Sequence, residues 1–239
     1  MQPTQFTLPV TLPEDETLDS FYSSTPHPAV NYIRQYLMEP VGTAPLYLFG
    51  ASGAGKSHLL YAACVQAQEM GLTSQLLALE HLQQLDARVL DDLEHLDLVC
   101  LDNIQAIATD MSWQTAVFDL YNRMAEQGKC LLIVANEAPT QLGFQLADLV
   151  SRLQACTSFQ LRLPGDAEKQ LLLQHKAHVR GIELTTEVAR YLLNRQQRDI
   201  RALVAILDQL DKASIVHQRK ITIPFVKAVL ADDDGHHFD

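Results

Sequence analysis

The fold is decided by the stretch Gly50-Ala51-Ser52-Gly53-Ala54-Gly55-Lys56-Ser57. These eight residues match the phosphate-binding pattern G-x-x-x-x-G-K-[ST]. The apolar run Leu46–Gly50 precedes them and the helical pattern Lys56–Met70 follows, which is the context that this motif requires. The stretch therefore predicts a strand–loop–helix unit that binds a nucleoside di- or triphosphate.

The residue types in this loop explain the expected chemistry. Glycines let the backbone wrap around phosphates, and N–H groups at a helix start point at the anion. Lys56 would neutralise the β and γ oxygens, and the Ser57 hydroxyl would hold Mg²⁺. The phosphate-binding residues that we expect are Gly50, Ser52, Gly53, Ala54, Gly55, Lys56, Ser57 and His58.

Around this loop, apolar strands alternate with amphipathic helices. The expected strands are Leu46–Gly50, Gln75–Glu80, Leu98–Asp102, Leu131–Asn136 and Thr157–Leu161. The expected helices are Ala29–Met38, Lys56–Met70, Leu82–Leu93, Ser112–Gln127 and Leu146–Leu153. Near-continuous apolar strands separated by helices indicate a doubly wound parallel sheet of five strands with helices on both faces.

The pattern changes at Pro164-Gly165, beyond which only helices are predicted. They span Ala167–Arg180, Thr186–Gln196, Ile200–Gln218 and Pro224–Leu230, with Asp166 and Thr185 as expected N-caps. We therefore expect an irregular N-terminal arm (1–25), an α/β nucleotide-binding domain (26–164) and a small all-α domain (165–239).

The third expected strand delivers a carboxylate to the phosphate site. Leu98-Val99-Cys100-Leu101 are apolar, and Asp102 at the strand end would reach Mg²⁺ or its waters. ATPases of the motor type usually carry a second acid next, but Asn103 occupies this position and cannot accept a proton. Because loss of a general base costs about 10²–10⁴ in rate, slow intrinsic hydrolysis is expected. The alternative is that Asn103 only begins a turn and that a base lies elsewhere.

Composition limits the remaining choices. The net charge is −11, with 18 Lys+Arg against 29 Asp+Glu in 239 residues, which argues against strong direct DNA binding. The four cysteines are about thirty residues apart, without metal or redox spacing, so buried free thiols are expected. The N-terminus lacks the features of a secretory signal and no run is long enough to span a membrane, so we expect a cytoplasmic protein without membrane contact.

Several of these segments occur in an order that resembles AAA+ proteins of the bacterial replication initiator DnaA group. They are Gly50–Ser57, Leu98–Gln105, Asn136, Ser151-Arg152-Leu153 and Asp199-Ile200-Arg201. The opening Thr17-Leu18-Asp19-Ser20-Phe21 is also similar, and the resemblance covers roughly residues 5 to 230. It implies an AAA+ P-loop NTPase fold, in which the helical domain is a lid over the nucleotide.

The resemblance implies a role for three polar residues. Asn136 would be the sensor-1 residue near the γ-phosphate, Arg152 an arginine finger offered to the nucleotide of a neighbouring subunit, and Arg201 the sensor-2 residue of the lid. From position alone, an arginine such as either of these is more often a surface residue with its stem packed and its head solvated. The initiator also has a C-terminal DNA-binding domain and a second acid after the Walker-B Asp, and this sequence departs from it at both points.

The N-terminal arm contains Gln5-Phe6-Thr7-Leu8-Pro9-Val10, which looks like the sliding-clamp-binding peptide of regulatory members of this group. Gln5 can hydrogen-bond to backbone in a pocket, Leu8 and Val10 can fill an apolar cleft, and Pro9 limits the entropy lost on docking. The expected clamp-binding residues are Gln5, Phe6, Leu8 and Pro9. Near the end of the arm, Phe21 and Tyr22 would line the adenine pocket, or else pack onto the following helix.

Together with the residues above, the resemblance implies a negative regulator of chromosomal replication initiation. It would hold ADP or ATP with Mg²⁺, dock on the DNA polymerase sliding clamp and promote hydrolysis of ATP bound to DnaA. The alternatives are an autonomous AAA+ ATPase such as a helicase loader, and a P-loop small-molecule kinase, which the helical lid fits poorly. The sequence also leaves open the alternative of a homodimer in which the surface around Arg152 is covered.

Overall fold

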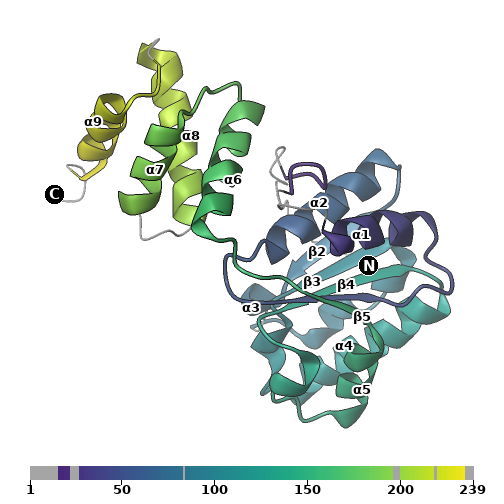
Figure 1. The fold of residues 1–239 in the computed structure, drawn as a ribbon. Helices are drawn as coiled ribbons and strands as arrows, with labels where there is room; N and C mark the ends of the chain where they lie inside the picture. Colours follow the sequence, from purple (N-terminus) through teal and green to yellow (C-terminus); the bar gives the residue numbers. More distant parts are fainter. Residues whose placement is uncertain (1–15, 22–26, 83, 196–199, 218–219, 235–239) are drawn as a thin grey trace, which may run out of the picture. The chain divides into compact units, whose positions relative to one another are not determined.

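The structure is a computed structural model that describes residues 16–21, 27–82, 84–195, 200–217 and 220–234. The described residues form two compact units, one that ends at Arg162 and one that begins at Leu163 (Figure 1). The first unit is a sheet with helices and the second contains helices alone. The fold class is therefore α/β followed by an all-α unit, as predicted.

The first unit contains a five-stranded parallel sheet in the order β2-β3-β4-β1-β5. Its strands are β1 (Leu46–Phe49), β2 (Ser74–Ala78), β3 (Leu98–Asp102), β4 (Cys130–Ala135) and β5 (Thr157–Gln160). Every residue of β3 and β4 is buried, which explains their unbroken apolar sequences. Gly50, Asn136 and Leu161 lie just after their strands rather than inside them.

Helices cover both faces of this sheet because side chains alternate along each strand. Leu46 and Leu48 of β1 pack in one core cluster with the first two helices, whereas Tyr47 packs in the other with the later ones. The α-helices of this unit are α1 (Pro28–Met38), α2 (Lys56–Glu69), α3 (Leu79–Leu82), α4 (Met111–Glu126) and α5 (Ala147–Ala155). The sheet is thus doubly wound (Figure 1).

The prediction of one helix over Leu82–Leu93 is wrong, as is the extension of the second strand to Glu80. The chain instead forms α3, then the 3₁₀ turns η1 (Ala87–Leu90) and η2 (Leu93–His95). Asp86 accepts a hydrogen bond from the N–H of Arg88, and Asp92 is left-handed with φ 63°. Short polar side chains that bond to nearby backbone compete with a continuous helix in this way.

Tyr36 links α1 to the start of β4. It is buried, and its hydroxyl accepts a hydrogen bond from the N–H of Leu131 at 3.0 Å. Tyr36→Phe should lower the free energy of unfolding by about 1–3 kcal/mol, because the buried N–H loses its acceptor. Chemical denaturation measures this loss. The half-buried Tyr32, which bonds to the carbonyl of Ala44 at 2.6 Å, is the control, and Tyr32→Phe should cost less because water can replace its hydroxyl.

The second unit has its own apolar core, formed by four helices. They are α6 (Asp166–Val179), α7 (Thr186–Arg195), α8 (Ile200–His217) and α9 (Ile223–Asp234). Thr185 caps α7 as predicted, since its hydroxyl accepts from the N–H of Val188 at 3.4 Å. Asp166 is not the N-cap of α6 but its first residue; Gly165 takes the cap position, and its N–H donates to Glu168.

Two further sequence expectations concern cysteines and membranes. All four cysteines are free and buried, as predicted. Within the part of the chain that the structure describes, no helix has the length and apolar character needed to cross a bilayer.

Candidate functional site

The Gly-rich loop joins β1 to α2 and adopts backbone conformations that favour glycine. Gly50, Gly53 and Gly55 have φ of 152°, 83° and 93°. A Cβ on Gly50 would clash with the carbonyl of Leu161, and one on Gly55 would lie 2.8 Å from the ring of Phe21. The loop is therefore the strand–loop–helix turn that the motif predicts, and Phe21 lies directly against it.

Three polar side chains meet behind this loop. Lys56 is buried, and its ammonium group donates to the carbonyls of Gly50 at 2.8 Å and Ala51 at 2.9 Å. The Ser57 hydroxyl donates to Oδ2 of Asp102 at 2.9 Å, so the start of α2 and the end of β3 come together.

The Asp102 carboxyl has the properties of a metal ligand. Burial raises its pKa, against the bond from Ser57 and the charge of Lys56. Its Oδ1 is buried and accepts no hydrogen bond from the described residues. A buried oxygen that lacks a donor, next to a hydroxyl, suits a hard cation such as Mg²⁺. The donor set therefore fits the metal that the sequence predicts at Ser57 and Asp102.

A side-chain amide connects the end of β3 to the end of β4. Nε2 of Gln105 donates to Oδ1 of Asn103 at 3.0 Å, and its Oε1 accepts from the N–H of Asn136 at 3.2 Å. Asn103 is left-handed with φ 57° and precedes the 3₁₀ turn η3 (Ile104–Ile107). Asn136, the predicted sensor-1 residue, thus lies beside the position where a second acid would stand.

Arg152 projects from α5 onto two aromatic rings of α4. It is exposed, and its guanidinium carbon lies 6.0 Å from the ring centroid of Phe118 and 5.8 Å from that of Tyr121. Cation–π contact holds the guanidinium while its outer edge remains available to a ligand. The structure therefore presents Arg152 as an exposed cation that lies over the rings of Phe118 and Tyr121.

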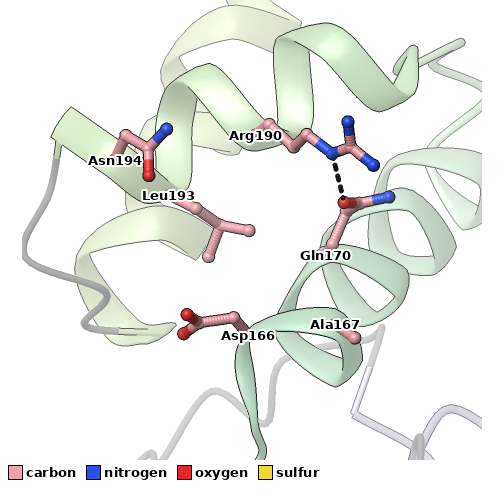
Figure 2. A pocket seen from close by; sticks show the side chains of 6 residues that line it. All are labelled: Asp166, Ala167, Gln170, Arg190, Leu193 and Asn194. Atoms are coloured by element: carbon pink, nitrogen blue, oxygen red, sulfur yellow. Dashed lines mark hydrogen bonds between the residues drawn. The ribbon is translucent and has the colours of Figure 1, made fainter.

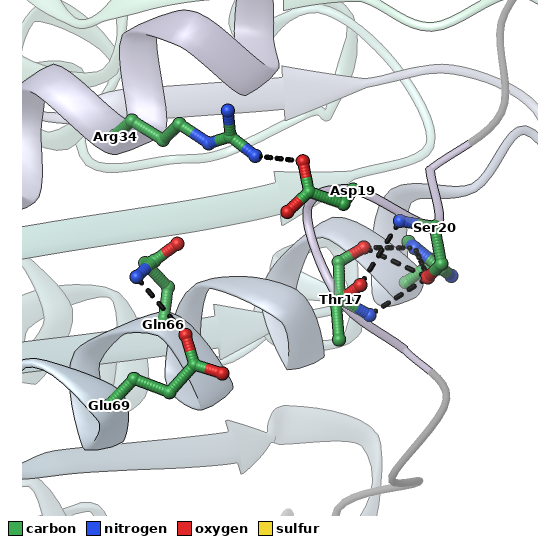
Figure 3. Close-up of polar contacts among 7 residues, drawn as sticks. Thr17, Asp19, Ser20, Arg34, Gln66 and Glu69 are labelled. Carbon is green, nitrogen blue, oxygen red and sulfur yellow. Dashed lines mark hydrogen bonds and ion pairs between the residues drawn. The ribbon is translucent and has the colours of Figure 1, made fainter.

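The segment 16–21 packs onto the start of α2 through His58. Its Nε2 lies 3.0 Å from the carbonyl of Thr17, and its ring is 5.5 Å from that of Phe21. Thr17 and Ser20 close a turn through mutual hydrogen bonds, and Asp19 pairs with Arg34 of α1 (Figure 3). The side chain of His58 thus anchors this segment, a contact that the sequence did not predict.

Several predicted site residues lie outside the described residues. They are Gln5, Phe6, Leu8 and Pro9 of the arm, and Tyr22. The backbone of Arg201 belongs to the first turn of α8, but its side chain is not described.

The all-α unit contains a pocket of about 300 Å³ between α6 and α7 (Figure 2). Arg190 donates to Gln170 at 3.3 Å on its wall. The lining residues are Asp166, Ala167, Gln170, Arg190, Leu193 and Asn194. Sequence reasoning assigned none of them to a site.

Fold and site together define an AAA+ P-loop nucleotide-binding protein with a helical lid. The model of the bacterial DnaA ATPase domain matches residues 32–160, and that of the Hda lid domain matches residues 166–230. The chain therefore belongs to the bacterial DnaA ATPase-domain family, and its lid makes it an Hda-like, DnaA-related AAA+ protein.

Solved structures agree with this fold. Domain III of the Thermotoga maritima replication initiation protein DnaA has a TM-score of 0.74 at 22% identity, covering 92% of this chain and 98% of that chain. AMPPCP-bound DnaA from Aquifex aeolicus has a TM-score of 0.68 at 22% identity, covering 83% and 65%. The Thermotoga maritima RuvB Holliday junction branch migration motor has a TM-score of 0.61 at 15% identity, covering 90% and 71%.

Proposed function

We propose that this protein is a negative regulator of replication initiation that promotes hydrolysis of ATP bound to DnaA. Its exposed Arg152, offered in trans, would stabilise the charge that develops on the transferred phosphate. An arginine finger supplied in trans can raise hydrolysis by about 10³–10⁵-fold. The observation that carries this proposal is the exposed guanidinium on the Phe118–Tyr121 platform, in a DnaA-type domain joined to an Hda-type lid.

The P-loop of this chain would bind ADP or ATP as a regulatory ligand rather than as a substrate that is rapidly hydrolysed. Lys56 would contact the phosphates, and Ser57 and Asp102 would hold Mg²⁺, which would neutralise phosphate charge. Asn103 and Gln105 offer amides where a general base would be needed, and an amide cannot accept a proton at neutral pH. The bound nucleotide would therefore turn over slowly.

The test is hydrolysis of ATP preloaded on DnaA, followed with and without this protein and with and without clamp loaded on DNA. Faster hydrolysis of the DnaA-bound ATP that requires both this protein and the loaded clamp supports the proposal. Rapid turnover of free ATP by this protein alone would instead favour an autonomous ATPase. Sedimentation with and without nucleotide would show whether a homodimer forms.

The proposed clamp contact predicts a separable defect. Replacing Gln5, Leu8 and Pro9 together with Ala should abolish capture by the immobilised clamp, because the hydrogen-bonding and apolar groups of the peptide are removed. Nucleotide affinity should stay unchanged, since these residues precede the P-loop domain. Thr7→Ala, at a position between the expected anchors, is the matched control; equal capture of the triple variant and this control would contradict the clamp assignment.

A further inference from the structure

Gln114 is a buried amide on α4 that joins two loops of the candidate site. Its side chain is fully buried, with 0% exposure. Nε2 donates to the carbonyls of Ile107 at 3.2 Å and Ala108 at 2.8 Å. Oε1 accepts from the N–H groups of Gln145 at 2.9 Å and Leu146 at 3.0 Å. A primary amide has two donors and two acceptor sites, so every one of them is used.

These four bonds connect the end of η3, the turn that follows β3, to the beginning of α5. Ile107 and Ala108 follow Asp102 by a few residues, at the end of η3. Leu146 is the N-cap of α5, the helix that carries Arg152. Helices α4 and α5 lie on the same face of the sheet and pack against each other (Figure 1). Gln114 thus lies between the metal-ligand strand and the helix of the exposed arginine.

The chemistry of Gln114 indicates a geometric role. Burying an amide is costly unless it is hydrogen-bonded, and a leucine would fill a similar volume in the apolar cluster around it. Unlike a leucine, the amide forms directional hydrogen bonds, and these bonds hold the segment 107–108 and the start of α5 in a fixed relative position. Its four hydrogen bonds all go to backbone groups and its side chain is fully buried, so it does not itself touch a ligand.

We propose that Gln114 is a positioning residue, through which the nucleotide site of this chain determines where Arg152 is held. A change at Asp102 would move the segment 103–108, and Gln114 would transmit this movement to the N-terminus of α5. This inference rests on the proposed function of Arg152 and adds the element that makes Arg152 responsive to nucleotide.

The first test replaces Gln114 with Leu. Stimulated hydrolysis of DnaA-bound ATP at saturating concentration should fall by about 10–100-fold, because small displacements of a catalytic group are costly. Amide hydrogens of Gln145 and Leu146 should exchange faster, since they lose a buried acceptor. Affinity for ADP and for the clamp should stay within about threefold of the unaltered protein, because none of the four hydrogen bonds of Gln114 goes to the Gly-rich loop.

Gln114→Glu separates the two halves of the amide. Because this position is fully buried and faces the carbonyls of Ile107 and Ala108, the new carboxyl should stay protonated. One of its oxygens can still accept from Gln145 and Leu146, whereas its single O–H can donate to only one of the two carbonyls. If the proposed coupling exists, stimulation by the unaltered protein should change when ADP is added. In this variant we expect slow exchange at the amides of Gln145 and Leu146, and a much smaller effect of ADP on stimulation. Retained ADP dependence in this variant would overturn the proposed coupling.

Met124→Ala is the matched control for lost stability. Met124 is fully buried in the same cluster on the same helix, and its side chain is apolar. This variant should have a lower melting temperature. Its stimulation of DnaA-bound ATP hydrolysis, normalised to the amount of variant that holds nucleotide, should be unchanged. If Arg152→Ala stimulates normally, the proposed function itself fails. If Arg152→Ala is inactive while Gln114→Leu stimulates fully with slow exchange at Gln145 and Leu146, only the positioning role is overturned.

Discussion

Arg152→Ala should reduce the stimulated hydrolysis of DnaA-bound ATP by about 10³-fold or more, to the level without this protein. The guanidinium is the charged group that α5 exposes above the rings of Phe118 and Tyr121. Alanine removes it without disturbing the P-loop, since Lys56, Ser57 and Asp102 bond among themselves and to the loop. ADP affinity and clamp capture should therefore not change.

Two further variants make this result specific. Arg152→Lys keeps the charge but loses the planar fork, so it should recover only a small part of the stimulation. Arg190→Ala removes an exposed arginine from the lid and should stimulate normally. Normal stimulation by Arg152→Ala would exclude the finger, whereas a loss shared by Arg190→Ala would point to a general charge effect.

The centre of the sheet could be predicted because β3 and β4 are buried throughout and almost entirely apolar. Leu98–Asp102 was predicted with its observed bounds. The Gly-rich motif requires a strand before it and a helix after it, so it predicted β1 and α2 as well. The stretch 82–93 could not be predicted, because the choice between helix and turns depends on local bonds of Asp86 and on the left-handed Asp92. Hydrophobic spacing contains no information on such bonds.

The candidate site was predictable where a residue type alone defines the chemistry. Lys56, Ser57 and Asp102 belong to motifs, so their meeting was expected. Gln105 and Gln114 act through partners on distant segments, which a sequence without tertiary contacts does not show. One signal was available for Gln114: it is a polar residue on the helix face that also carries Trp113, Val117 and Leu120, all buried.

Lys56→Ala should raise the dissociation constant for ADP by about 10- to 100-fold. A charge-assisted hydrogen bond contributes about 1.5–3 kcal/mol, and each 1.4 kcal/mol is tenfold in affinity. Lys56 is buried over the carbonyls of Gly50 and Ala51, where its charge is available to the phosphates that the loop would hold. No other residue of the motif supplies a full positive charge.

Thermal unfolding with and without ADP separates this loss of binding from a loss of stability. At ADP equal to 100 dissociation constants, the unaltered protein gains about 2.7 kcal/mol, whereas a variant binding 100-fold more weakly gains about 0.4 kcal/mol. The two carbonyls left without the ammonium group lower the melting temperature of the apo form, so the increment caused by ADP is the quantity to compare. Lys129→Ala removes the same charge beside β4, where Lys129 pairs with Asp97, and should keep the full increment. An unchanged increment in Lys56→Ala would mean that the nucleotide does not bind at the Gly-rich loop.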